Sequence, residues 1–242
     1  MLPLRDHLPT RRAPIVNSAL IGANVLAFLF ERMQFAAGVS PVALTYHFGL
    51  VPARVFVDPI GGVETVLTSM FMHGSLLHIG GNMLFLYIFG DNVEDAMGHL
   101  RYLAFYLAGG ICAAAAQVLV DPTSTLPMVG ASGAISAVLA AYAVLYPRSP
   151  IMVVNPVPIL WLFFGLFLYF PAWLVIGEYF LVNLLDAMTN TQQGGIAFAA
   201  HIGGFVGGAL LLRVLMTGRP RTDNYDRWRQ WAERRQRRDD SW

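Results

Sequence analysis

The distribution of charge constrains this chain more than any other feature of its sequence. Of its 31 charged side chains, four lie in residues 1–12 and fourteen in residues 213–242, which leaves thirteen for the 200 residues between. Charged side chains normally make up about 25% of a globular protein and lie mostly on its surface. So few charges cannot cover a water-exposed surface of this size. The sequence therefore predicts an integral membrane protein.

Six apolar stretches are each about long enough to cross a bilayer as a helix, which takes about 20 residues. They lie at 14–30, 70–89, 100–120, 129–146, 168–185 and 195–215. A further apolar run at 151–167 complicates the count. We expect an all-α integral membrane fold, with a bundle of six transmembrane helices over 14–216. An N-terminal segment, 1–13, precedes this domain, and an Arg-rich tail, 217–242, follows it.

The positions of arginine, which supplies all sixteen basic residues, predict the orientation of the helices. If the N-terminus is inside, the cytoplasmic segments hold the tail arginines together with Arg5, Arg11, Arg12, Arg101 and Arg148. The outer loops 121–128 and 186–194 contain no basic residue. Because cytoplasmic loops are enriched in arginine, we expect both termini to be cytoplasmic. The tail arginines are interleaved with acids and directly follow a hydrophobic helix, which favours anionic lipid headgroups over nucleic acid as their partner.

Polar side chains are costly inside a bilayer, so those within the expected spans are functional candidates. They form three clusters near the starts of the second, fourth and sixth spans. In chain order the clusters contain His73, His78 and Asn82; Gly130, Ser132 and Gly133; and His201, Gly204 and Gly208. These three spans all run from the outer surface inward. At about 1.5 Å per residue the clusters share a depth of roughly 5–12 Å below that surface.

The residue types in these clusters point to acyl transfer. Close packing of the fourth and sixth spans, through the small residues on both, would bring Ser132 Oγ within hydrogen-bond reach of the His201 imidazole. A serine hydroxyl becomes a nucleophile when an adjacent base takes its proton. His78 and Asn82, four residues apart on one helix face, would donate to the oxyanion of the intermediate. No acidic residue lies near His201 in the sequence, so we expect a Ser-His dyad.

The motifs that carry these residues match a known family in order and in span. They read His73-(x4)-His78-(x3)-Asn82, Gly130-Ala-Ser132-Gly133 and Ala200-His201-x-x-Gly204, with a further match at 89–95. Over about residues 14–216 the chain resembles the rhomboid intramembrane serine proteases. The resemblance implies that Ser132 is the nucleophile and His201 the general base. It further implies an oxyanion site of His78, Asn82 and the Ser132 N–H, and a structural role for His73.

The resemblance also implies a substrate class and a location. Substrates would be single-span membrane proteins, cut near the outer end of their helix, and the fifth span, around 171–174, would move to admit them. No cofactor or metal is expected. The bacterial inner membrane is the expected location. Ser136 stands where some relatives carry an aromatic ring that stacks on the catalytic imidazole, and Glu178 is an unusual charge for a fifth span.

Two alternatives stay open on the sequence. His73, His78 and His201 could bind zinc, although Asn82 and the glycine-flanked serine would then be unexplained. A non-catalytic, rhomboid-like protein that binds or escorts membrane helices is the second alternative, although such proteins typically lack the serine or the histidine that this chain has. The single cysteine, Cys112, excludes an intramolecular disulfide framework.

Overall fold

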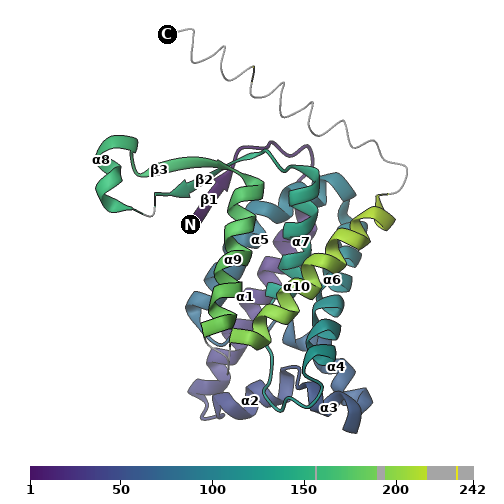
Figure 1. The fold of residues 1–242 in the computed structure, drawn as a ribbon. Helices are drawn as coiled ribbons and strands as arrows, with labels where there is room; N and C mark the ends of the chain where they lie inside the picture. Colours follow the sequence, from purple (N-terminus) through teal and green to yellow (C-terminus); the bar gives the residue numbers. More distant parts are fainter. Residues whose placement is uncertain (156, 190–193, 217–232, 234–242) are drawn as a thin grey trace.

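A computed structural model describes residues 1–155, 157–189, 194–216 and 233. Long helices form an upright bundle with a small sheet at one end and short helices at the other (Figure 1). We call the end with the sheet the N-terminal face and the other end the opposite face. The Arg-rich tail at 217–242 lies outside the described residues except for Glu233.

Among the described residues, six helices of 14 or more residues overlap the six apolar stretches, although α5 begins six residues later than its stretch and α9 four residues later. They are α1 (Ile15–Ala36), α5 (Leu76–Met97), α6 (His99–Val120), α7 (Ser132–Leu145), α9 (Ala172–Thr189) and α10 (Gly194–Leu215). Within the described residues, three segments are long and apolar enough to cross a membrane: Ile15–Ala36, His99–Val120 and Phe198–Leu215. Ser132–Leu145 and Ala172–Leu185 are shorter apolar helices. The fold is therefore mostly helical, with three candidate spans supported by length and composition.

Three short helices occupy the segment between α1 and α5. They are α2 (Pro41–Phe48), α3 (Pro52–Val57) and α4 (Pro59–Ser69), and each has a proline in its first turn. Proline suits that position because its fixed φ is helical and its missing N–H would have no helical partner. Asp58 caps α4 by accepting from the Gly61 N–H at 3.1 Å. These helices cover the opposite face of the bundle (Figure 1).

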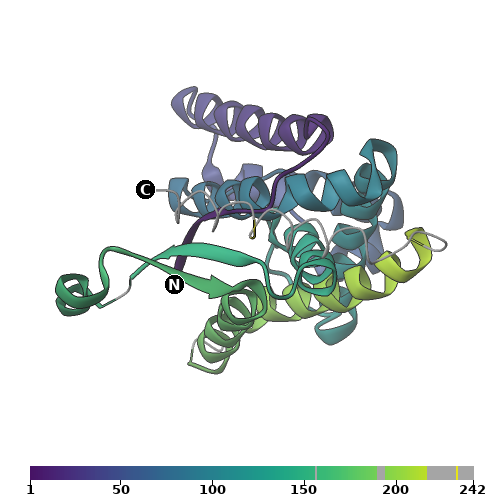
Figure 2. The same ribbon diagram turned by 90° about the horizontal axis from the view of Figure 1, so that it is seen from above.

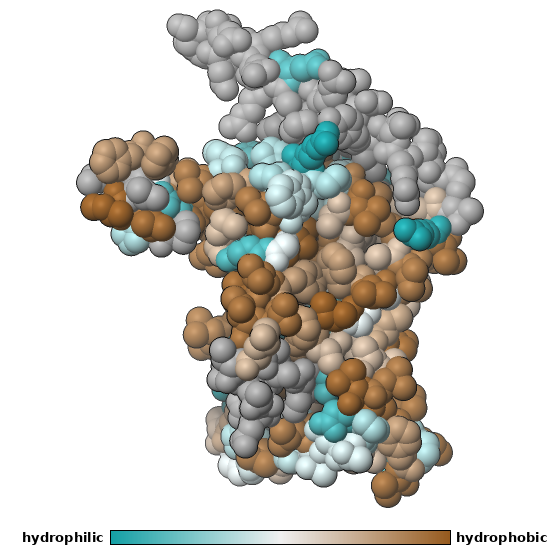
Figure 3. All heavy atoms as spheres, viewed as in Figure 1, coloured by the Kyte–Doolittle hydropathy of each residue, from teal (hydrophilic) through white to brown (hydrophobic). Residues whose placement is uncertain are grey.

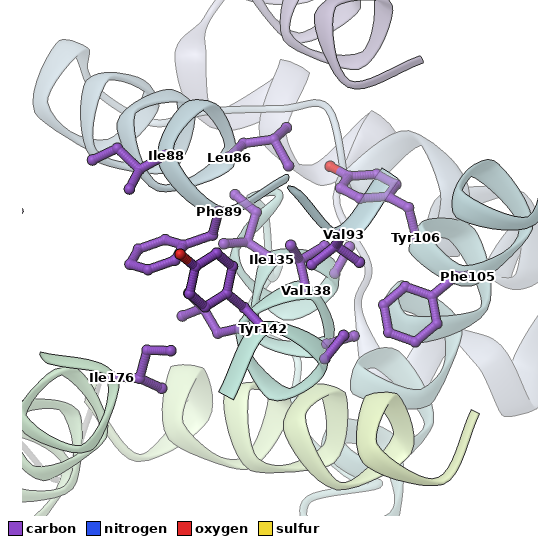
Figure 4. Close-up of a cluster of buried hydrophobic side chains, with 14 of the residues drawn as sticks. Leu86, Ile88, Phe89, Val93, Phe105, Tyr106, Ile135, Val138, Tyr142 and Ile176 are labelled. Carbon is purple, nitrogen blue, oxygen red and sulfur yellow. The ribbon is translucent and has the colours of Figure 1, made fainter. Parts of the chain in front are cut away.

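The core lies around α7, whose residues 133–142 are all buried. Figure 4 shows Tyr142 of α7 beside Phe89 of α5, with Ile135 and Val138 of α7 in the same cluster and Ile176 of α9 at its edge. The surrounding helices instead expose large apolar side chains, which appear as a brown band across the face shown in Figure 3. The helix α7 is thus surrounded by protein. Its neighbours turn apolar faces outward, as expected for helices in a bilayer.

The all-α prediction is wrong at the N-terminal face. There β1 (Leu2–Asp6), β2 (Pro150–Val154) and β3 (Phe167–Pro171) form an antiparallel sheet in the order β1-β2-β3. The apolar run at 151–167 belongs to the β2–β3 hairpin, whose tip contains a 3-10 turn (Pro158–Leu160) and α8 (Trp161–Phe164). Prolines interrupt helical hydrogen bonding in this run, and its β-branched residues favour strands.

Asp6 attaches the sheet to the bundle. Its Oδ2 accepts from Asn92 Nδ2 of α5 at 2.6 Å and lies 2.8 Å from the Tyr142 hydroxyl of α7. Burial, and next the charge of Asp91, raise the pKa of Asp6 to about 7. On α9, the Glu178 carboxylate pairs with the amino group of Met1.

Candidate active site

Ser132 and His201 meet between α7 and α10. Ser132 is the first residue of α7, and His201 lies in the second turn of α10. Ser132 Oγ is 2.8 Å from His201 Nε2. The imidazole is buried, with 6% of its residue exposed, and Ser132 is half-buried. A hydroxyl that donates to a neutral imidazole nitrogen at this distance is placed for proton transfer.

Glycines allow α7 and α10 to approach so closely. A β-carbon on Gly204 would collide with the Gly133 carbonyl oxygen, and one on Gly208 would lie 2.5 Å from Ala137 Cα. A β-carbon on Gly133 would in turn lie 2.5 Å from Ala113 Cβ on α6. These glycines, singled out in the sequence, therefore set the separation of the two helices that carry Ser132 and His201.

The loop before α7 brings His78 to the same place. Gly130 has a φ of +129°, which L side chains rarely adopt, and its N–H donates to the Ser69 carbonyl at 2.9 Å. A β-carbon at Gly130 would lie 2.7 Å from His78 Nε2 and 3.6 Å from Ser132 Oγ. The imidazole of His78 therefore lies against the backbone that leads into the serine.

His73 holds the side chain of Asn82. The Asn82 amide nitrogen is 2.9 Å from His73 Nε2, and His73 Nδ1 is 3.2 Å from the Phe71 carbonyl oxygen. An amide N–H can only donate, so Nε2 accepts and the protonated Nδ1 donates to Phe71. The His73 backbone N–H donates to the buried Glu31 carboxylate at 2.9 Å. Sequence reasoning missed Glu31, which lies one residue beyond the first expected span, 14–30.

These side chains line one cavity of about 300 Å³. Ser132, His201, His78 and Asn82 all contribute to its wall, and most of the remaining wall is apolar. Mostly apolar walls with a few convergent polar groups are typical of binding and active sites. The cavity therefore brings together the residues that were selected from three separate spans.

Tyr179 of α9 is a residue of this site that sequence reasoning missed. Its ring centroid is 6.0 Å from that of His201, with the planes tilted by 44°. Its hydroxyl interacts with Ser136, whose Oγ donates to the Ser132 carbonyl at 2.8 Å. The aromatic neighbour of the imidazole thus comes from α9 rather than from position 136 on α7. Nothing in the local sequence distinguishes Tyr179 from the other aromatic residues of the spans.

The described residues show no side chain or backbone group hydrogen-bonded to His201 Nδ1. They also contain no group of three or more His, Cys, Asp or Glu side chains arranged to hold a metal ion. The nitrogen of His73 that faces the site, Nε2, already accepts from Asn82. The three histidines of the zinc alternative are therefore not arranged as a ligand set.

Several known proteins are similar in sequence to this chain. The family model described as "Rhomboid domain" matches residues 61–218. "Rhomboid protein 1, mitochondrial" of Saccharomyces cerevisiae is 29% identical over 79% of this chain and 51% of its own length. "Rhomboid protease AarA" of Providencia stuartii is 31% identical over 59% of this chain and 52% of its own length.

A third relative, "RHOMBOID-like protein 12, mitochondrial" of Arabidopsis thaliana, is 28% identical over 66% of this chain and 48% of its own length. The chain thus spans about half the length of these curated relatives. The family model itself covers well over half of the chain and includes all the clustered polar residues described above. This integral membrane protein therefore belongs to the rhomboid family.

Proposed function

We propose that this protein is a serine endopeptidase that cleaves the transmembrane helices of other membrane proteins. The observation that carries the proposal is the 2.8 Å contact between Ser132 Oγ and His201 Nε2 at the wall of a cavity. The similarity to a protein named as a rhomboid protease supports it. A hydroxyl paired with imidazole is the arrangement that activates serine for attack on a carbonyl.

The proposed reaction has two steps. In the first, Ser132 Oγ attacks the carbonyl carbon of the peptide bond while His201 Nε2 takes the hydroxyl proton. His201 then gives that proton to the leaving amine, and the C–N bond breaks to leave an acyl-enzyme. In the second, water attacks the ester, His201 takes and returns a proton, and Ser132 is released. The proposed mechanism uses no third catalytic residue. Among the described residues, no group is hydrogen-bonded to His201 Nδ1.

His78, Asn82 and the N–H of Ser132 are proposed to bind the oxyanion. Asn82 Nδ2 has two hydrogens, and the bond to His73 Nε2 uses one of them. The second hydrogen is available to the site, and His73 fixes the plane of the amide. The His78 imidazole lies against Gly130, close to Ser132. Preorganised donors of this kind cost no reorganisation as charge develops.

The six long helices are proposed to be six transmembrane spans with both termini cytoplasmic. The cavity would then open toward the outer side, and a substrate helix would be cut near its outer end. Water needed for hydrolysis would enter the cavity from that side. Because Tyr179 lies on α9 and contacts the site, we propose α9 as the helix that moves to admit substrate.

The membrane compartment is a further part of the proposal. The sequence suggests the bacterial inner membrane, and one of the relatives above comes from a bacterium. The two others carry "mitochondrial" in their names. Fractionation of the cells that express the chain natively is the test of this assignment.

The test of the activity uses the purified full chain in liposomes with a model single-span substrate. The wild type should cleave it, and Ser132→Ala and His201→Ala should abolish cleavage while the thermal unfolding temperature stays unchanged. Ser124→Ala, at a buried serine in the loop before α7, is the matched control and should cleave normally. If Ser132→Ala cleaves at an undiminished rate, the assignment fails.

The same assay separates the alternatives. Loss of cleavage on addition of a chelator would favour a metal site, whereas labelling of Ser132 by a serine-directed phosphonate would favour the dyad. A wild type that binds the substrate helix without cutting it, in a bilayer where a known rhomboid protease cuts it, would indicate the non-catalytic, rhomboid-like alternative.

A further inference from the structure

The β2–β3 hairpin is the part of the molecule that the proposed activity does not use. No charged residue lies between Arg148 and Glu178. The hairpin projects sideways from the bundle at the N-terminal face (Figures 1 and 2). Its two strands, of five residues each, reach about 17 Å at about 3.3 Å per residue. An uncharged arm of this length needs an apolar environment or a partner.

Large apolar side chains at the tip of this hairpin are exposed. Phe163 is 75% exposed, and Phe164 and Ile159 are each 65% exposed. Trp161, Phe167 and Tyr169 are also exposed. Tryptophan and tyrosine are enriched where membrane proteins cross the interface between headgroups and acyl chains. The aromatic composition of the tip is thus typical of a membrane interface.

Several polar groups of the tip are hydrogen-bonded within the hairpin itself. The Trp161 indole N–H donates to the Asn155 carbonyl at 2.9 Å, and the Asn155 amide donates to the Gly165 carbonyl at 3.1 Å. Two backbone bonds, Asn155 N–H to Leu166 and Gly165 N–H to Trp161, close the turn. Contact with lipid requires such internal pairing because acyl chains offer no hydrogen bonds. A tip built to pair with a peptide would leave these groups available.

The apolar surface of the hairpin continues onto a helix surface that faces the membrane. β3 runs directly into α9, where Trp173, Leu181 and Leu185 are each more than half exposed. The hairpin base is held to the end of α7 through the N–H groups of Ala172 and Trp173, which donate to the carbonyls of Ser149 and Pro147. The arm therefore starts at the membrane-facing side of the bundle.

Charge at the N-terminal face fits a lipid surface as well. Five arginines at this face are among those that are exposed: Arg5, Arg11, Arg12, Arg101 and Arg148. Basic residues beside a membrane are attracted to anionic headgroups at about 1 kcal/mol each. An apolar tip beside exposed arginines is the combination found in elements that lie in a membrane interface.

We propose that the tip of the β2–β3 hairpin inserts into the lipid leaflet at the N-terminal face, beside α9. The exposed edge of β3 lies at headgroup depth, where water can pair with it, and the aromatic tip lies among the upper acyl chains. The hairpin then fixes the end of α9 at that leaflet. This proposal does not depend on the proposed proteolytic activity.

The experiment places a fluorescent label at the tip in liposomes of phosphatidylcholine with phosphatidylglycerol. The full chain carries Ser132→Ala, so that no cleavage occurs, and Cys112→Ala, so that the label has one site. Phe163→Cys tests the tip, and Ile159→Cys provides a second position in case the first variant fails to fold. Leu181→Cys on α9 is the lipid-facing reference, and Thr125→Cys, exposed in the loop at the opposite face, is the aqueous reference.

Quenching by lipid with a nitroxide at acyl carbon 5 should be about threefold stronger at Phe163→Cys than at Thr125→Cys, as for a group at the headgroup and acyl boundary. Quenching by aqueous iodide should be weaker at the tip by a similar factor. Iodide quenching at the tip as strong as at Thr125→Cys would overturn the proposal. So would shielding from both quenchers that disappears as the protein is diluted in lipid, since a second protein copy would then cover the tip.

Discussion

The regions at the two ends of α7 differ in how closely their side chains are packed. At the first end, Gly133, Gly204 and Gly208 lie so close to neighbouring atoms that a β-carbon would overlap them. Beyond the second end, Phe163 and Phe164 in the hairpin are mostly exposed. Both regions are mostly apolar, and no Asp, Glu, Lys or Arg lies in either of them. Apolar composition therefore does not tell protein contacts from lipid contacts, whereas the space around each side chain does.

This difference has a direct consequence for function. The packed end holds Ser132 and His201 at 2.8 Å, a distance that depends on the separation of two helix backbones. None of the described residues of the hairpin lines the cavity. Small substitutions should therefore abolish activity at the packed end, whereas the hairpin should tolerate apolar exchanges.

The largest effect on cleavage is expected when one methyl group is added at Gly204, in the packed end. In Gly204→Ala the new β-carbon would overlap the Gly133 carbonyl oxygen, so α10 must move away from α7. His201 moves with it, and because a displacement of only about 1 Å in a catalytic group can already cost about 100-fold, loss of the contact with Ser132 should cost more. Because overpacking also destabilises by about 1–3 kcal/mol, we expect cleavage near the level of Ser132→Ala and a lower unfolding temperature.

Gly22→Ala is the matched control for this methyl group. Gly22 lies within α1, and a β-carbon there would meet nothing within 4 Å. Alanine favours a helix over glycine by about 1 kcal/mol, so this variant should be slightly more stable and should cleave normally. Wild-type cleavage by Gly204→Ala would show that the glycine contact does not set the site.

The next effect is expected at the oxyanion site. Asn82→Ala removes one donor and should lower kcat by about 100- to 1000-fold, the usual cost of such a donor. KM should change little, because the interaction forms mainly in the transition state. Steady-state kinetics in liposomes measure both quantities. An unchanged kcat with a raised KM would instead mean that Asn82 binds the substrate.

Much of the site could be predicted from the sequence for a physical reason. Polar residues are so costly in a bilayer that Ser132, His201, His78 and Asn82 stand out in an apolar chain, and helical spacing places each on a face. The helices could be predicted because a bilayer fixes their length. The structure then brings these four side chains to one cavity.

What could not be predicted depends on contacts between distant parts of the chain. Tyr179 reaches His201 only because α9 packs beside α10, and an aromatic residue in a span is otherwise unremarkable. The sheet pairs Leu2 with Val154, some 150 residues apart, so no local sequence pattern predicts β1. The hairpin could not be separated from a span because both are uncharged and apolar.

A smaller effect on kcat is expected from substitution of Tyr179, the residue through which α9 contacts His201. Tyr179→Ala removes the ring beside His201, and such contacts contribute about 0.5–1.5 kcal/mol, so kcat should fall by up to about tenfold. Tyr179→Phe keeps the ring and should lose less. Tyr87→Ala, at an exposed ring on α5, is the control and should keep its kcat. Equal kcat in the alanine variant and the wild type would remove Tyr179 from the positioning of His201.

The smallest effect concerns the attachment of the sheet and depends on pH. Burial and the charge of Asp91 raise the pKa of Asp6 from 3.8 to about 7. The folded state therefore holds a proton that the unfolded chain releases above about pH 4, so stability from this group is lost as pH rises from about 4 to 7. The unfolding temperature of the wild type should accordingly fall between pH 5 and pH 8.

Asp6→Asn isolates this contribution because every other titrating group stays in place. The amide oxygen can still accept from Asn92 Nδ2 and from the Tyr142 hydroxyl, so the sheet keeps its attachment. The variant has no carboxyl proton to lose, and its unfolding temperature should fall by less than that of the wild type over the same pH range. Equal falls in the two proteins would mean that Asp6 is already ionised in the folded state. Since Asp6 lies at the sheet and outside the cavity, cleavage by the variant should match the wild type at each pH.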